Sequence, residues 1–171
     1  MNSEEINEIF ERAKKDPSLF STMDIENLLE TIENEKNDYL ENKTMSDIAN
    51  VLMEQLNDLN LGSQEVEVMY GKLIGYRFVD EIHELHKGKN VRWIRKQSTN
   101  NVRLVNGQGT NNVRLTNGGI VVDIKFLDTG VHVLCLNSRQ RFIQYKFDDC
   151  LTFQKLSTEE QLILMAYEHI I

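Results

Sequence analysis

The fold of this chain is decided by a stretch that begins Gly119-Ile120-Val121-Val122-Asp123-Ile124-Lys125-Phe126. Large apolar side chains occupy every second position, so in an extended chain they share one face: Ile120, Val122, Ile124 and Phe126. A period of two residues predicts a β-strand with one face in the core. Asp128-Thr129-Gly130 then predicts a tight turn, because glycine adopts positive φ at little cost.

Four further segments have the composition of short strands: residues 90–96, 131–136, 142–147 and 150–154. In the third of these, Ile143, Tyr145 and Phe147 share one face, and Gln144 and Lys146 share the other. Residues 131–136 are nearly all apolar, which predicts a strand covered on both faces. Five strands at short, regular spacing are typical of a small antiparallel barrel.

The preceding part of the chain, residues 1–62, predicts an acidic helical region. Apolar residues recur at helical spacing in three segments, with predicted starts at Ser3, at Asp24 and at Ser46 or Asp47. Pro17 is expected to end the first helix and Gly62 the third. Short amphipathic helices do not bury their apolar stripe alone, so we expect them to pack on one another, on the barrel or on a partner.

Two further segments complete the chain. Residues 63–86 are interpreted as a connector, in which Val66, Val68 and Tyr70 alternate like a strand that could add an edge to the barrel. Ser157 followed by Glu160 matches a capping box and predicts a closing apolar helix. That helix is expected to plug the barrel, to dock on the N-terminal helices or to contact another subunit.

Charge is distributed very unevenly along the chain. Residues 1–86 carry 20 acidic and 7 basic side chains, a net charge of −13, whereas residues 87–171 carry 7 acidic and 12 basic ones, a net charge of +5. Residues 87–115 contain no acid at all. We therefore predict a binding surface made of Lys87, Lys89, Arg92, Trp93, Arg95, Lys96, Arg103 and Arg114.

Two interpretations of this basic surface remain open. It could bind nucleic acid, with the cations neutralising phosphates and Trp93 or Phe142 stacking on a base. It could instead pair with the chain's own acidic helices. The overall net charge of −8 argues against a dedicated nucleic-acid binder.

An internal repeat interrupts the basic stretch. Residues 99–107 read TNNVRLVNG, and residues 110–118 read TNNVRLTNG, eleven positions later. One duplication is too short for a solenoid, so we interpret residues 97–118 as a lengthened loop between the first two barrel strands. The Asn-Gly pairs predict tight turns and two small hairpin-like excursions.

The sequence contains no recognisable catalytic signature, and we predict a non-enzymatic protein without cofactor or metal. His83-Glu84-Leu85-His86 has one residue too few between Glu84 and the second histidine to match a zinc-protease helix. His83, His86, His132 and a cysteine could in principle hold a metal ion, but the sequence does not predict such a site. Cys135 and Cys150 are expected to be free, buried thiols of an intracellular protein. No membrane span is expected.

Residues 88–95, GKNVRWIR, followed by residues 115–122, LTNGGIVV, resemble the opening of SH3-like barrels of the Tudor and KOW type. The pattern is also similar to small barrel-bearing proteins of nucleocytoplasmic large DNA viruses. This resemblance covers about residues 85–155 and implies a component of the virion or of the viral factory in the host cytoplasm. A methyl-lysine cage of the Tudor kind would draw on Trp93, Phe126, Phe142 and Tyr145, and we do not predict one.

Together these observations predict an α+β protein. Its parts are an acidic helical region (1–62), a connector (63–86) and a five-stranded antiparallel SH3-like barrel with a basic insert (97–118) and a closing helix (87–171). The predicted function is that of a structural or adaptor protein that contacts protein partners in a larger assembly. The alternative is a nucleic-acid-binding module that uses the basic residues 87–115.

Overall fold

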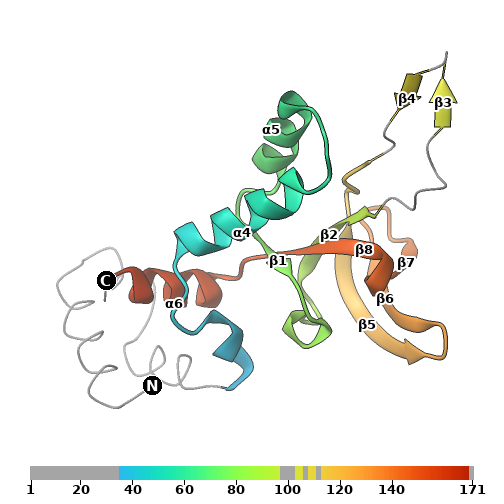
Figure 1. The fold of residues 1–171 in the computed structure, drawn as a ribbon. Helices are drawn as coiled ribbons and strands as arrows, with labels where there is room; N and C mark the ends of the chain where they lie inside the picture. The colour runs from blue at the N-terminus through green and yellow to red at the C-terminus, as the bar shows by residue number, and fades with distance from the viewer. Residues whose placement is uncertain (1–34, 97–102, 106–107, 111–112, 170–171) are drawn as a thin grey trace. The chain divides into compact units, whose positions relative to one another are not determined.

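The structure, a computed structural model, describes residues 35–96, 103–105, 108–110 and 113–169 of the 171-residue chain. Within these ranges the protein is α+β, with three α-helices and a six-stranded antiparallel sheet (Figure 1). The first predicted N-terminal helix and most of the second lie outside the described residues, and the end of the second, which was predicted to reach Tyr39, is a 3₁₀ helix. The chain divides into two compact units, residues 1–49 with 156–171 and residues 50–155.

The six-stranded sheet has the order β1-β8-β2-β5-β6-β7, and every pair of neighbours is antiparallel. All five predicted strands are present, so that part of the prediction is confirmed. The predicted number of strands was wrong, because Tyr76–Val79 in the predicted connector adds a sixth strand beside β8. The bounds are β1 Tyr76–Val79, β2 Asn90–Arg95, β5 Gly119–Leu127, β6 Gly130–Leu136, β7 Phe142–Lys146 and β8 Cys150–Lys155.

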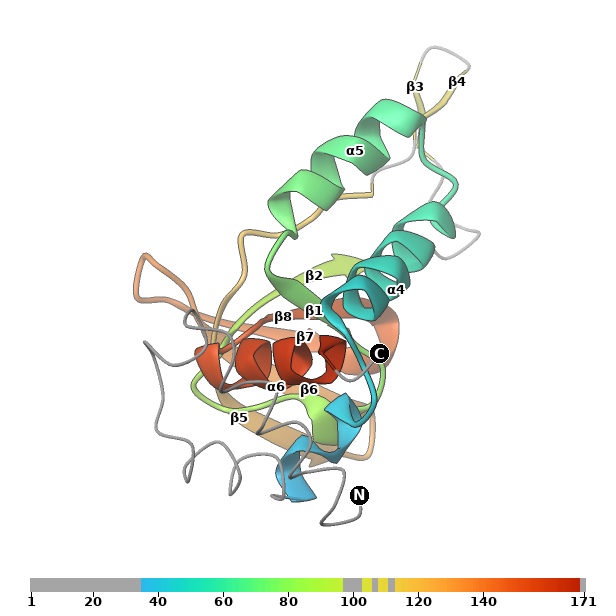
Figure 2. The same cartoon turned by 90° about the vertical axis from the view of Figure 1, so that its left-hand side faces the viewer.

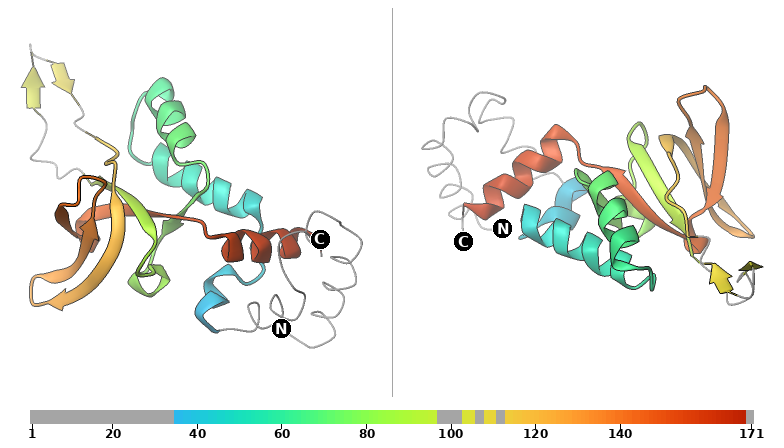
Figure 3. Two further views of the ribbon diagram at one scale, coloured as in Figure 1. Left: turned by 180° about the vertical axis from the view of Figure 1, so that it is seen from behind. Right: turned by 90° about the horizontal axis from the view of Figure 1, so that it is seen from above.

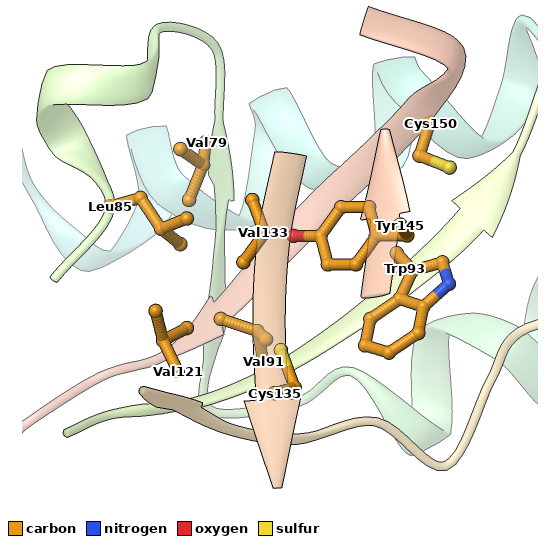
Figure 4. Close-up of a cluster of buried hydrophobic side chains, with 9 residues drawn as sticks. All are labelled: Val79, Leu85, Val91, Trp93, Val121, Val133, Cys135, Tyr145 and Cys150. Carbon is orange, nitrogen blue, oxygen red and sulfur yellow. The ribbon is translucent and has the colours of Figure 1, made fainter. Parts of the chain in front are cut away.

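One face of this sheet encloses a core in which Trp93 of β2 stacks on Tyr145 of β7, with ring centroids 4.1 Å apart (Figure 4). In a flat sheet these two strands, three positions apart, would be separated by about 14 Å. The Tyr145 hydroxyl also lies 3.0 Å from Oγ1 of Thr152 on β8, four positions away in the sheet. The sheet must therefore curl strongly around this core, as the bent β5–β6 hairpin shows (Figure 3).

Strand β8, which lies between β1 and β2 in the sheet, is buried on both faces. Cys150 and Thr152 face the enclosed core, whereas Leu151 and Phe153 face a second core beneath the helices α4, Met45–Asn57, and α5, Ser63–Lys72. The helices contribute Leu52, Leu56, Val66 and Leu73 to this second core. Burial on two sides explains why β8 reads as a nearly continuous run of buried residues rather than an alternating one.

Strand β5 buries the opposite face from the one expected for its first half. Val121 is buried, whereas Ile120 and Val122 are exposed. The pairing with β6 shifts between Val121 and Asp123, which makes Val122 the extra residue of a β-bulge. After the bulge Ile124 packs against the enclosed core. The prediction that Ile120, Val122, Ile124 and Phe126 share one buried face was wrong, because a bulge breaks the period of two.

Residues 63–72 form a helix where the alternation of Val66, Val68 and Tyr70 had indicated a strand. The same segment also carries the helical spacing i, i+3, i+4 and i+7, and that set packs in the second core: Val66, Met69, Tyr70 and Leu73. Gly62 precedes α5 as its N-cap rather than ending the third helix, since α4 ends at Asn57. The expected third helix itself is confirmed.

In the first unit, the closing helix α6, Thr158–Glu168, is confirmed together with its Ser157–Glu160 capping box. It packs against the 3₁₀ helix η1, Glu35–Leu40, in a core that contains Leu40, Ile163, Leu164 and Tyr167 (Figure 2). Side-chain hydrogen bonds join the same two elements, from Asn37 to Glu159 and from Tyr39 to Glu160.

The remaining elements are short. Two 3₁₀ turns, η2 (Ile82–Glu84) and η3 (Phe147–Asp149), connect strands, and η3 leads from β7 directly into β8. Strands β3, Arg103–Val105, and β4, Gln108–Thr110, pair with each other in a separate two-stranded sheet. This is one hairpin among the described residues of the insert, where two had been predicted. No described helix has the length and apolar character required to cross a bilayer.

Candidate functional site

The predicted basic surface does not form one continuous patch, because β2 sends successive side chains to opposite faces. Val91 and Trp93 lie in the enclosed core, whereas Ile94 lies in the core beneath the helices. Arg92 shares the face of Ile94, and Arg95 at the strand end is exposed. A charge run in the sequence is thus divided between two sides of the sheet.

Trp93 is 6% exposed and occupies the enclosed core, stacked on Tyr145 at an interplanar angle of 18°. The ring is covered by neighbouring side chains, so it has no free face on which a base could stack. Figure 4 shows the indole ring beside Tyr145, with Cys135 and Cys150 in the same cluster. A ligand of the predicted basic surface would therefore have to bind without contacting the Trp93 ring.

Arg92 joins three segments of the second unit. Its Nε donates a 2.8 Å hydrogen bond to the carbonyl of Thr116, and its Nη1 donates a 3.4 Å bond to the carbonyl of Lys72 at the end of α5. These bonds occupy much of the guanidinium group and hold residues 113–117 between β2 and α5. Arg92 acts mainly as a structural clamp.

Lys87 makes an ion pair with Asp123 of β5, with 3.3 Å between Nζ and Oδ1. The hydrogen bond from this ammonium group, and a second from the backbone N–H of Ile124, keep the pKa of Asp123 below its usual value. Both side chains are well exposed, so this pair contributes little to stability.

The other predicted cations make no ion pair within the described part of the chain. Lys96 donates to the carbonyl of Asp148 at 3.4 Å. Arg95 and Arg114 are exposed and Lys89 is partly exposed, and none of these three has a carboxylate partner there. Arg103 belongs to β3, for which only the backbone is described. The alternative that the basic stretch is neutralised by the chain's own acidic helices therefore has no support among these residues.

One cation outside the predicted surface is buried. Arg77 of β1 is 2% exposed, and its Nη2 donates a hydrogen bond to the carbonyl of Glu84. Sequence reasoning passed over this residue because it stands alone in an acidic region. The alternation of Arg77 and Val79 with Phe78 on β1 was the signal that could have placed it inside.

A groove lies between α5 and residues 113–117, with a cavity volume of about 530 Å³. The helix contributes Gln64, Glu65, Val68, Met69 and Lys72, and the facing segment contributes Val113, Arg114, Leu115 and Asn117. A smaller cavity of about 350 Å³ lies on the other side of Val113, beside Asn60, Lys96 and Leu151. The groove brings Arg114 together with α5, an element that the predicted surface did not include.

A second candidate surface is an apolar strip on the outer face of β5, β6 and β7. Register places Ile120, Leu136 and Phe142 side by side across the three strands. Phe142 is 68% exposed and Ile120 is 42% exposed, and the bulge residue Val122 on β5 is 38% exposed. Sequence reasoning missed this strip because it assigned Ile120 and Val122 to the core.

The two cysteine thiols and the Tyr145 hydroxyl of the second unit are buried. Burial raises the pKa of the Cys135 thiol to about 12 and that of Cys150 to about 11. Burial also raises the pKa of Tyr145, and its hydrogen bond to Thr152 acts in the opposite direction. A thiol with a raised pKa is a weak nucleophile at neutral pH.

The three histidines of the possible metal site, His83, His86 and His132, have separate surroundings. His83 pairs with Glu81 at 3.2 Å, and His132 lies between Thr129 and Gln144 on the outer side of β6. The backbone N–H of His86 donates to the buried amide oxygen of Gln154. Across the residues that the structure describes, no three His, Cys, Asp or Glu side chains are grouped as a metal ion would require.

Comparison with known proteins adds no assignment: no family model, curated protein or solved structure matches this chain. The groove and the apolar strip must therefore be interpreted from their own chemistry.

Proposed function

We propose that this chain is a non-enzymatic structural or adaptor protein that makes protein–protein contacts through an SH3-like barrel. Three features of the topology support the barrel. Hairpins join β5, β6 and β7 in succession, η3 turns the chain into β8, and β8 returns to pair with β2. In this proposal β1 is an addition at the edge of the barrel.

The observation that carries the proposal is the outer apolar strip of Ile120, Leu136 and Phe142. Large apolar side chains grouped on one face of a sheet are costly in water and mark contact sites on soluble proteins. Phe142 is the best anchor, because an exposed aromatic ring offers the largest apolar area to a partner. Its neighbours in the row would form the rest of the contact.

The proposed setting is a larger assembly, and the sequence resemblance suggests a virion or a viral factory of a large DNA virus. The acidic first half of the chain supports an assembly role, because a surface with a net charge of −13 favours basic partners.

The proposal is tested by affinity purification of the tagged full-length chain from its source cells, followed by mass spectrometry. The double variant Ile120→Ser with Phe142→Ser should reduce recovery of a specific partner by about tenfold or more. Phe126→Ser is the matched control, since Phe126 is 73% exposed but lies outside the strip. A partner recovered equally with all three proteins would contradict this surface, as would the absence of any specific partner.

The alternative function is nucleic-acid binding by the basic residues 87–115. The free cations Lys89, Arg95 and Arg114 favour it, whereas the burial of Trp93 and the net charge of −8 count against it. Binding to random DNA is measured between 50 and 200 mM salt. A phosphate-binding surface should lose affinity steeply, by about 10³-fold for six contacts, and a protein-binding module should bind DNA weakly at every salt concentration.

A further inference from the structure

The groove between α5 and residues 113–117 has walls that are fixed before any partner arrives. The backbone N–H of Thr116 donates to the carbonyl of Trp93 at 3.0 Å. The hydroxyl of Thr116 accepts a hydrogen bond from the backbone N–H of Trp93 at 3.1 Å. Leu115 forms a bridge with Ile94 and is buried. Arg92 ties the same segment to the end of α5. A preformed groove has little ordering entropy to lose on binding.

The two walls of the groove, α5 and residues 113–117, run in the same direction from N-terminus to C-terminus. Val113 also lines the cavity beside Asn60, in the turn that precedes α5. Arg92 bonds both Thr116 and Lys72, so the far end of the segment lies at the C-terminal end of α5. Arg114 is therefore near the start of the groove and Lys72 near its end.

The groove combines an apolar floor with unneutralised positive charge. The apolar part of the lining consists of Val68, Met69, Val113 and Leu115. Val68 lies in the middle of α5 and is 58% exposed, so its side chain is accessible to a ligand. Lys72 and Arg114 have no carboxylate partner among the described residues, and Glu65 is the one acid in the lining.

We propose that this groove binds a short acidic peptide segment of a partner protein, in extended form, with one apolar side chain seated over Val68 and Leu115. Carboxylates on either side of that anchor would meet Arg114 at one end and Lys72 at the other. The inference rests on the proposed function as a protein-binding module, but it concerns a different surface from the apolar strip. The two can therefore fail separately.

A peptide fits the lining better than a nucleic acid does. Single-stranded nucleic acid binds through aromatic rings that stack on bases and through a continuous row of cations. The groove lining contains no aromatic side chain and only two cations. An apolar anchor with flanking carboxylates uses both cations of the lining and the four apolar side chains that a phosphate backbone would leave unused.

The experiment is selection of a phage-displayed library of random linear heptapeptides on the immobilised full-length chain. We expect enriched peptides to carry Asp or Glu on both sides of one apolar residue. Fluorescein-labelled copies of the winners are then titrated by anisotropy against the wild type and the double variant Lys72→Glu with Arg114→Glu. Affinity should fall by about tenfold or more in the variant, because both charge contacts become repulsive.

The matched control is Arg139→Glu with Arg141→Glu, which makes the same change of charge at exposed cations outside both the groove and the predicted basic surface. This variant should retain affinity within about threefold. A fluorescein-labelled dT12 oligonucleotide is titrated in parallel. The proposal is overturned if no acidic peptide is enriched, if the two double variants weaken binding equally, or if the oligonucleotide binds more tightly than every peptide and loses affinity with the groove variant.

Discussion

The two copies of the internal repeat have nearly the same sequence and different structures. Residues 99–107 and 110–118 differ at one of nine positions, where Val105 in the first copy corresponds to Thr116 in the second. In the first copy, Arg103–Val105 forms β3 and pairs with β4 in a separate sheet. In the second, Leu115 is buried and pairs with Ile94 beside the main sheet.

The difference has two visible physical causes. The hydroxyl of Thr116 accepts a hydrogen bond from the N–H of Trp93, and valine at the same position has no such group. The second copy is also followed by Gly119, where the first is followed by Gln108, and Gly119 allows the backbone to pass close to the carbonyl group of Leu136 on β6. The comparison shows that a local pattern supplies extended chain and that a single hydroxyl and one following glycine help to decide where it packs.

The largest effect is expected for Gly118→Ala. Gly118 has a φ of +74°, and a Cβ there would lie 1.8 Å from the carbonyl oxygen of Val91, so the backbone must move. We expect the free energy of unfolding to fall by about 3 kcal/mol or more, measured by urea denaturation. Gly71→Ala is the control: it lies in α5 with open space around it, and we expect a gain of about 0.5–1 kcal/mol. Equal midpoints for the two variants would refute the close approach.

The second-largest effect is expected at the leucine that occupies the equivalent position in both copies, Leu104 in the first and Leu115 in the second. Leu115→Ala leaves a cavity in the core beneath the helices, and we expect unfolding to become easier by about 2–4 kcal/mol. Leu104→Ala changes the equivalent position in an isolated two-stranded sheet, where we expect a loss below about 1 kcal/mol. Thermal unfolding followed by circular dichroism checks both. Equal losses would mean that the two copies contribute equally to the fold.

The smallest effect concerns the position that distinguishes the copies. Thr116→Val removes the acceptor of the Trp93 N–H and should cost about 1–2 kcal/mol. Hydrogen exchange at the Trp93 amide should accelerate accordingly. The reciprocal change, Val105→Thr, should alter stability by less than about 0.5 kcal/mol. If Thr116→Val leaves exchange at Trp93 unchanged, the hydroxyl does not hold this segment in place.

Much of the secondary structure could be predicted from local patterns. The alternation of Ile143, Tyr145 and Phe147 placed β7 with the correct face inward, and the Ser157–Glu160 pair located the start of α6. Prediction failed where the apolar residues matched both the helix and the strand period, and where a β-bulge interrupted the strand period. Residues 63–72 satisfy both strand and helix spacing, and the bulge at Val122 reversed the buried face of β5.

The candidate site could be predicted only in part. A segment without acids predicted a basic surface and left open whether the chain's own acids neutralise it; among the described residues, Arg95 and Arg114 lack carboxylate partners. The sequence could not show that Trp93 would be enclosed or that Arg92 would be occupied by two carbonyl groups. It also gave no sign of the wall that α5 contributes to the groove.

By itself, the sequence determined five of the six strands of the main sheet, the closing helix and the uneven distribution of charge, because these depend on spacing and composition along the chain. Only the tertiary structure decided which face of each element is buried and which cations remain free. The physical reason is that β2 contacts β8 and residues 115–116, which are distant in sequence, and that the curled sheet brings Trp93 and Tyr145 together across three strand positions. Contacts of that range leave no periodic trace in the chain.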